Sequence, residues 1–175
     1  MCLPKTKEDL PRSYGIRKDS SSGGRVTFRF AKVGTWRATD HEDPIEGYIT
    51  IAKADPTLEG GCNGAYLVKS SSATKGWINL LYDIAMEWAT KNGMGLTSDR
   101  FGVKEDCYKI WENYLNKREN EVGAIQVEDC MQRVSTTWAK TLKIEPCEVA
   151  TSFVYKNKTI DIIDGLAGKK KYKEK

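Results

Sequence analysis

The chain has 175 residues, the length of one compact domain, because domains cluster near roughly 100–150 residues. Hydrophobic residues make up 39% and charged residues 30% of the sequence, which excludes a wholly disordered chain. The formal net charge of +4 resides in residues 169–175, which hold five Lys and one Glu, so the rest of the chain is neutral. No apolar run approaches the roughly 20 residues of a membrane helix, and no signal peptide is visible, so we expect a cytoplasmic protein.

Metal, disulfide and triad chemistry are not indicated. The five cysteines are widely spaced and contain no C-x-x-C pair, which supports neither a zinc site nor a disulfide framework. The single histidine, His41, lies among acidic residues with no second His near it, which makes a hydrolase triad improbable. The phosphate-binding glycine motifs of nucleotide enzymes are absent from the sequence.

The first third of the chain predicts an arm and two strands. Residues 1–24 are polar and broken by prolines, so we expect an arm with at most short structure. Residues 25–32 and 47–54 alternate apolar with polar side chains, the period of a strand with one buried face. These two segments predict an antiparallel hairpin with a long loop.

The middle of the chain predicts alternating strands and helices. Residues 65–70 form an apolar run typical of a buried strand, and residues 94–99 predict a second short strand. Apolar residues recur at three- and four-residue spacing over 77–93 and 103–118, which predicts two amphipathic helices. The sequence therefore predicts an α/β fold with a mixed sheet.

The last third carries weaker patterns. We expect a helix over 127–142, a strand over 150–156 and a short helix within 159–168. Residues 169–175 predict a basic, solvated tail, with an electrostatic arm for nucleic acid as the second interpretation.

Residues 70–76 (SSSATKG) form a polar loop between a predicted strand and a predicted helix. The backbone N–H groups of such a loop and of the following helix N-terminus attract anions, and Lys75 adds positive charge. A pyrophosphate would fit this loop.

This order of elements, with its loop, resembles the GNAT (GCN5-related N-acetyltransferase) fold, a mixed, mostly antiparallel sheet flanked by helices. The family's loop motif is Arg/Gln-x-x-Gly-x-Gly/Ala, and aligning its central glycine on Gly76 places Ala73 and Ile78 at the outer positions. KGWINLLYDIAME (75–87), GLTSDR (95–100) and IWENYLNKR (110–118) resemble a group of phage-encoded GNAT-like proteins. The resemblance implies one GNAT-like domain over 25–168 and expression in the cytoplasm of a bacterial host.

The resemblance also implies a cofactor, acetyl-CoA or another acyl-CoA, and an amine acceptor as substrate. The implied cofactor-binding residues are Val68, Lys69, Ser70, Thr74, Lys75, Gly76 and Trp77. In the family, the acid for the departing thiolate is usually a Tyr on the helix after the fifth strand; Trp111 occupies the nearest position here, and Tyr114, one turn on, is the candidate acid. Asp99 is the candidate base, with a structural tie to Arg100 or to the next helix as the competing interpretation; Glu46 and Glu59 are weaker base candidates.

Three functions therefore stay open. The first is an N-acyltransferase acting on an unidentified amine. The second is a GNAT-shaped phage protein without catalysis that binds a host or virion component. The third is a protein that modifies or binds nucleic acid and uses residues 169–175 as an electrostatic arm.

Overall fold

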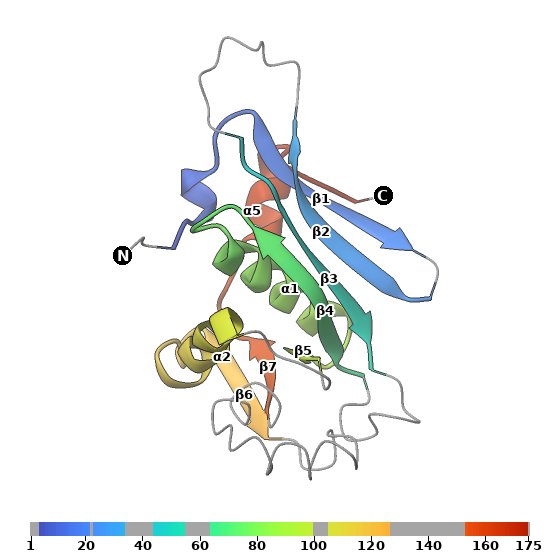
Figure 1. Cartoon of the computed structure of the whole chain (residues 1–175), viewed down its shortest axis with the longest axis vertical. Coiled ribbons are helices and arrows are strands. Elements are labelled where there is room, and N and C mark those ends of the chain that lie inside the picture. Colours follow the sequence, from blue (N-terminus) through green and yellow to red (C-terminus); the bar gives the residue numbers. More distant parts are fainter. Residues whose placement is uncertain are drawn as a thin grey trace. The chain divides into compact units, whose positions relative to one another are not determined.

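The computed structural model describes residues 4–21, 23–33, 44–54, 64–99, 105–126 and 153–174 (Figure 1). Its elements are, in chain order, the 3-10 helix η1 (Lys7–Asp9), β1 (Tyr14–Ser21), β2 (Arg25–Lys32), β3 (Gly47–Lys53), β4 (Tyr66–Ala73), α1 (Ile78–Asn92), β5 (Leu96–Ser98), α2 (Glu105–Asn116), β6 (Val122–Gln126), β7 (Phe153–Asn157), α5 (Ile163–Gly168) and β8 (Tyr172–Glu174).

The strands hydrogen-bond in the order β6-β7-β5-β4-β3-β2-β1-β8. Two pairs are parallel, β4 with β5 and β1 with β8, whereas β1 with β2, β5 with β7 and β6 with β7 are antiparallel. This mixed sheet, combined with helices, confirms the predicted α/β class.

Two compact units make up the chain, and each is described by itself. Unit 1 comprises Met1–Ile51, Ser70–Ala85 and Asp161–Lys175, and unit 2 comprises Ala52–Lys69 and Met86–Ile160. Among the residues described, no helix is long and apolar enough to cross a membrane.

In unit 1, β1 and β2 form an antiparallel hairpin, in which Ile16 pairs with Phe30. The side chains of Ile16, Phe28 and Phe30 are buried. Gly23 and Gly24 have φ of 87° and 75° in the turn, a conformation that side-chain-bearing residues rarely adopt. The expected arm over residues 1–24 therefore contains a full strand. Only the first three residues of β1 are buried, and the residues after them are charged or polar. The apolar pattern of β1 is therefore too short to predict a strand.

The C-terminal residues differ from the predicted solvated tail, because Tyr172–Glu174 form β8 alongside β1. The Lys171 carbonyl accepts a hydrogen bond of 2.8 Å from the Ile16 backbone N–H, and the Lys171 ammonium donates one of 2.8 Å to the Pro11 carbonyl. A Cβ at Gly15 would clash with the Lys171 carbonyl. Backbone pairing, which is independent of side-chain polarity, thus orders a segment whose composition suggested disorder.

In unit 2, the parallel pair β4 and β5 aligns Leu67 with Thr97 and Val68 with Ser98. The Thr97 hydroxyl donates a hydrogen bond of 2.8 Å to the Phe153 carbonyl of β7. The backbone N–H of Asn157, the last residue of β7, donates a hydrogen bond of 2.9 Å to Thr90 Oγ1 of α1. These part-buried hydrogen bonds connect α1, β5 and β7.

Most predicted elements agree with the structure. The strands predicted over 25–32, 47–54, 65–70 and 94–99 and the helices predicted over 77–93 and 159–168 are confirmed. For the strand predicted over 150–156 and the helix predicted over 103–118, the described parts, Phe153–Asn157 and Glu105–Asn116, agree with the prediction. β2 and β3 are neighbours in the sheet, as expected. The helix predicted over 127–142 lies outside the residues that the structure describes, as do His41 and Arg100. β6 had no counterpart among the predictions.

Candidate functional site

The loop after β4 is shorter than its composition suggested, because β4 continues to Ala73. Ser70 and Ser72 are exposed, whereas Ser71 is half-buried and its hydroxyl lies 3.1 Å from the Tyr82 hydroxyl of α1. A small side chain with a hydrogen-bond partner is compatible with a strand, so this serine run extends β4. The loop itself is residues 74–77.

Thr74 fixes the start of this loop against Glu46 in unit 1. The Thr74 N–H donates to the Glu46 carbonyl at 2.7 Å, and the Thr74 hydroxyl oxygen accepts from the Glu46 N–H at 2.9 Å. The Trp77 N–H then donates to the Thr74 carbonyl at 3.0 Å, closing a turn in which Gly76 has a φ of 93°. The turn needs glycine at position 76 because other residues rarely adopt a positive φ.

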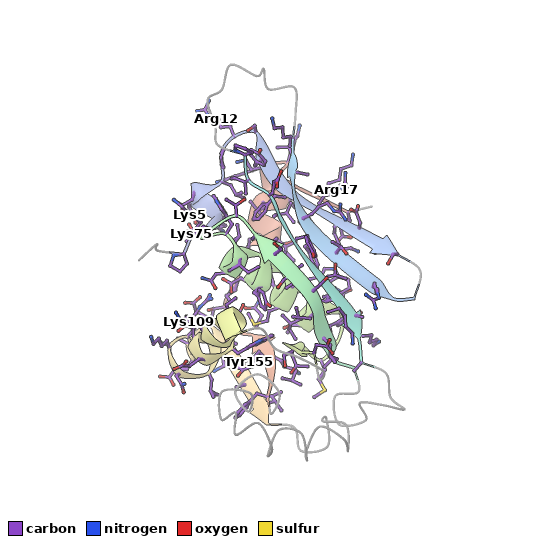
Figure 2. The ribbon with its side chains drawn as sticks, in the orientation of Figure 1. Lys5, Arg12, Arg17, Lys75, Lys109 and Tyr155 are labelled. Atoms are coloured by element: carbon purple, nitrogen blue, oxygen red, sulfur yellow. The ribbon has the colours of Figure 1, made fainter. Side chains whose placement is uncertain are left out.

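The loop presents donors and positive charge. The hydrogen bonds within the described part of the chain leave the backbone N–H groups of Lys75 and Gly76 unused. The first turn of α1 adds N–H groups without intrahelical partners and contains no acidic residue. Lys75 is exposed, and the Lys5 backbone N–H donates to the Gly76 carbonyl at 2.8 Å, which brings a second lysine to the loop (Figure 2). This arrangement suits an anion.

Trp77 anchors the loop through its ring, which is 6% exposed. The ring packs edge-on against Phe30 of β2, with 5.6 Å between centroids. Only the backbone of Trp77 is therefore available to a ligand. Ile78, at the first position of α1, is half-buried.

Lys69 and Asp99 come together in unit 2. Val68 pairs with Ser98, so the next residues along the two parallel strands lie side by side. The Lys69 ammonium donates a hydrogen bond of 3.5 Å to Asp99 Oδ1, and the two side chains are 23% and 22% exposed. The structure thus gives the candidate base an ion-pair partner that the sequence had assigned to the cofactor.

Tyr114 lies in an aromatic cluster of unit 2 formed with Trp111 and Tyr155. Tyr114 and Trp111 on α2 and Tyr155 on β7 are all buried. The Tyr155 centroid lies 5.3 Å from Trp111 and 5.7 Å from Tyr114. The Arg118 guanidinium lies over the Tyr114 ring, 5.4 Å from its centroid, a favourable cation–π contact. Burial raises the pKa of the Tyr155 phenol well above its ordinary value of 10.0.

The candidate residues thus fall into two groups. Ser70 and residues 74–77 belong to unit 1, whereas Val68, Lys69, Asp99 and Tyr114 belong to unit 2. Sequence reasoning missed Lys5, whose place beside the loop depends on a backbone hydrogen bond 71 residues away and has no local signal. Nowhere in the described ranges do three His, Cys, Asp or Glu side chains gather as a metal site would require.

Comparison of the chain with protein-family models, with curated proteins and with solved structures found no match.

Proposed function

We propose that the chain is an acyl-CoA-dependent N-acyltransferase that acts on an amine acceptor. The observation that carries this proposal is the loop of residues 74–77, which follows the fourth strand, leads into α1 and presents unused N–H groups beside Lys75. The GNAT resemblance assigns the pyrophosphate of coenzyme A to the loop at this place. The donor chemistry of the loop fits that anion, since backbone N–H groups and an ammonium are what a pyrophosphate needs.

The proposed cofactor contacts are mainly with the backbone. The N–H groups of Lys75, Gly76 and the first turn of α1 would hold the pyrophosphate, and the Lys75 ammonium would offset its charge. Val68, Lys69 and Ser70 precede the loop on β4 and would contribute backbone groups along the strand. When bound, the acyl-CoA supplies the thioester carbonyl that an amine attacks.

Proton handling is assigned to residues of unit 2 by the same resemblance. Asp99 would take a proton from the attacking amine, and Tyr114 would give a proton to the departing sulfur, so no covalent enzyme intermediate is needed. The resemblance assigns this acid to the helix after the fifth strand, and Tyr114 is a residue of α2, which follows β5 in the chain. Asp99 is held in place by Lys69.

The same ion pair favours a second candidate, a binding protein of this fold without catalysis. Because the Asp99 carboxylate already accepts a hydrogen bond from Lys69, its position is also explained by a structural role without catalysis. Such a protein would engage a host or virion component. A test of acyl-CoA binding distinguishes the two candidates, because only the acyltransferase requires this cofactor.

Calorimetric titration of the full chain with acetyl-CoA tests the proposal. We expect micromolar binding, equivalent to about −8 kcal/mol. Lys75→Glu should weaken binding at least tenfold, because the new carboxylate repels the pyrophosphate. Lys109→Glu, an equal change of charge at an exposed position on α2, should leave the affinity unchanged.

Two outcomes would contradict the proposal. Absence of binding at millimolar acetyl-CoA would remove the acyltransferase and favour the binding protein. Equal losses in the Lys75 and Lys109 variants would reject the placement of the pyrophosphate on residues 74–77. If acetyl-CoA binds, transfer of a radiolabelled acetyl group to spermidine and to a lysine-bearing peptide then tests for an amine acceptor.

A further inference from the structure

Three cations form a row across one face of unit 1. Arg17 on β1 pairs with Arg29 on β2 and with Lys173 on β8. Direct partners in neighbouring strands project to the same face, about 4.8 Å apart in the hydrogen-bonding direction. Because side chains alternate along a strand, this face is opposite the one that buries Ile16 and Phe30. We call Arg29, Arg17 and Lys173 the basic row.

Repulsion within the basic row is only partly relieved. Like charges directly opposite each other destabilise a sheet. Asp19 accepts contacts from both arginines, at 3.2 Å from the Arg17 Nε and 3.0 Å from the Arg29 Nε. Among the described residues, the three cations of the row and the Asp19 carboxylate together carry a net charge of +2. The side chains of Arg17 and Arg29 remain 35% and 44% exposed, and Lys173 is exposed as well.

An open pocket of about 460 Å³ adjoins the row at Arg29. It is lined by Tyr48, Glu46 and the hydroxyls of Thr27 and Thr50, which lie 2.8 Å apart. Tyr48 is 39% exposed, an unusual state for an aromatic residue when most others described are buried. The pocket therefore combines an exposed ring with polar groups next to the basic row.

We propose that this face binds single-stranded nucleic acid, with phosphates on the basic row and a base on Tyr48. Proteins that bind single strands combine a positive surface, which follows the phosphates, with aromatic rings on which bases stack. Glu46 repels a phosphate but accepts a hydrogen bond from the amino group of a base, so the pocket suits a base better than the backbone.

The charges of this site belong to the folded sheet, which distinguishes it from a flexible basic arm. Lys173 is held by the pairing of β8 with β1, and Arg17, labelled in Figure 2, extends from β1 itself. Binding by this face does not depend on acyl-CoA.

Fluorescence anisotropy of a labelled single strand of about 15 nucleotides, long enough for one sheet-sized site, tests the inference with the full chain. The double variant Arg29→Gln, Lys173→Gln should lower the affinity at least tenfold. It should also reduce the slope of log affinity against log salt by about 1.4, since each phosphate contact contributes about 0.7 for single strands. The matched control Lys109→Gln, Lys117→Gln, which removes two exposed lysines of unit 2, should change neither quantity.

Tyr48 variants test the stacking part separately. Tyr48→Ala should lower the affinity about tenfold and keep the salt slope, whereas Tyr48→Phe should bind like the wild type. Circular dichroism and melting temperatures establish that each variant is folded. The inference is overturned if the wild type does not bind at about 50 mM salt, the low end of the range where phosphate contacts dominate. It is also overturned if the two double variants lose affinity equally. A third contrary outcome is that Tyr48→Ala leaves the affinity unchanged while inorganic polyphosphate of equal charge displaces the labelled strand.

Discussion

Tyr155, on β7, is fully buried against Trp111 and Tyr114 of α2, and the pKa of its phenol departs clearly from the ordinary value. Loss of water around the ring raises the pKa, because the charged phenolate is disfavoured there. The folded state therefore binds this proton more tightly than the unfolded state, whose tyrosine titrates near 10.0. The stability that this provides is complete below pH 10 and is lost as the pH rises towards the folded-state pKa.

Tyr155→Phe should accordingly flatten the alkaline loss of stability. We expect the free energy of unfolding to fall less steeply from about pH 9 to pH 11 in the variant than in the wild type. Urea denaturation followed by circular dichroism at several pH values measures the slopes. Tyr48→Phe, which removes the hydroxyl group of an exposed tyrosine, serves as the matched control. Parallel curves for the wild type and Tyr155→Phe would show that this phenol is not responsible.

For single residues, the sequence predicts which side chains are buried but not which side chains contact each other. The spacing of Trp111 and Tyr114 placed both on one side of a predicted helix, and both are buried. The contact between Lys69 and Asp99 depends on the register of two parallel strands, which the sequence does not encode locally. The sequence analysis therefore named Lys69 and Asp99 separately and did not predict the ion pair between them.

The turn that follows α5 places Lys170 in a backbone conformation that residues other than glycine rarely adopt. The Lys170 N–H donates to the Ala167 carbonyl at 3.0 Å, and the Lys171 N–H donates to the Leu166 carbonyl at 2.8 Å. This is the Schellman arrangement, in which the residue with positive φ is usually glycine. Here Lys170 occupies it with a φ of 59°. A side chain in this conformation costs roughly 1–2 kcal/mol.

Lys170→Gly should therefore stabilise the protein. The relief of strain exceeds the entropy lost by a glycine on folding, so we expect a gain of about 0.5–1 kcal/mol in the free energy of unfolding. That gain corresponds to a rise of roughly 2–3 °C in Tm for a chain of this size. Lys170→Ala removes the same charge and keeps the Cβ, so it should give no comparable gain. Equal Tm values for the two variants would contradict the assignment of strain to the backbone.

Among the elements, α1 was predicted from its long periodic pattern, whereas β1 and β8, which lack such a pattern, were missed. α1 extends over four turns of regular apolar spacing, whereas β8 has three residues, two of them charged. β1 carries only Tyr14 and Ile16 as large apolar side chains in its buried part. β8 pairs with β1, and β6, which was also missed, pairs with β7; in both pairs the two strands lie far apart in the sequence, and local patterns do not report such pairing.

The excess of lysines in residues 169–175 is connected with the fold of unit 1. The sequence placed the net charge of the chain in a free tail, yet the structure uses part of that tail as a sheet edge. Lys18 and Glu174 add an ion pair of 3.7 Å across this edge. The C-terminal lysines therefore have a structural role, through their backbone, that is separable from their charge.

Deletion of residues 171–175 should lower stability, which a solvated tail would not. It removes the carbonyl bonded to the Ile16 N–H, the Lys171 contacts to the Leu10 and Pro11 carbonyls, and the final bond of α5. At about 1 kcal/mol for each of these four hydrogen bonds, we expect a loss of roughly 4 kcal/mol. The corresponding fall in Tm is roughly 8–16 °C, measured by thermal denaturation. The deletion also leaves β1 as an unpaired edge, so we expect more aggregation on heating.

A full-length variant with Gln at positions 169, 170 and 173 separates the backbone from the charge. Its Tm should stay within a few degrees of the wild type, since surface substitutions have small effects on stability. If both proteins melt like the wild type, β8 contributes nothing to the fold and the tail is solvated. If the Gln variant falls as far as the deletion, the lysine charges rather than the strand pairing stabilise the edge of unit 1. Only a fall confined to the deletion supports a C-terminal strand that holds β1 in the sheet and keeps Lys173 next to Arg17.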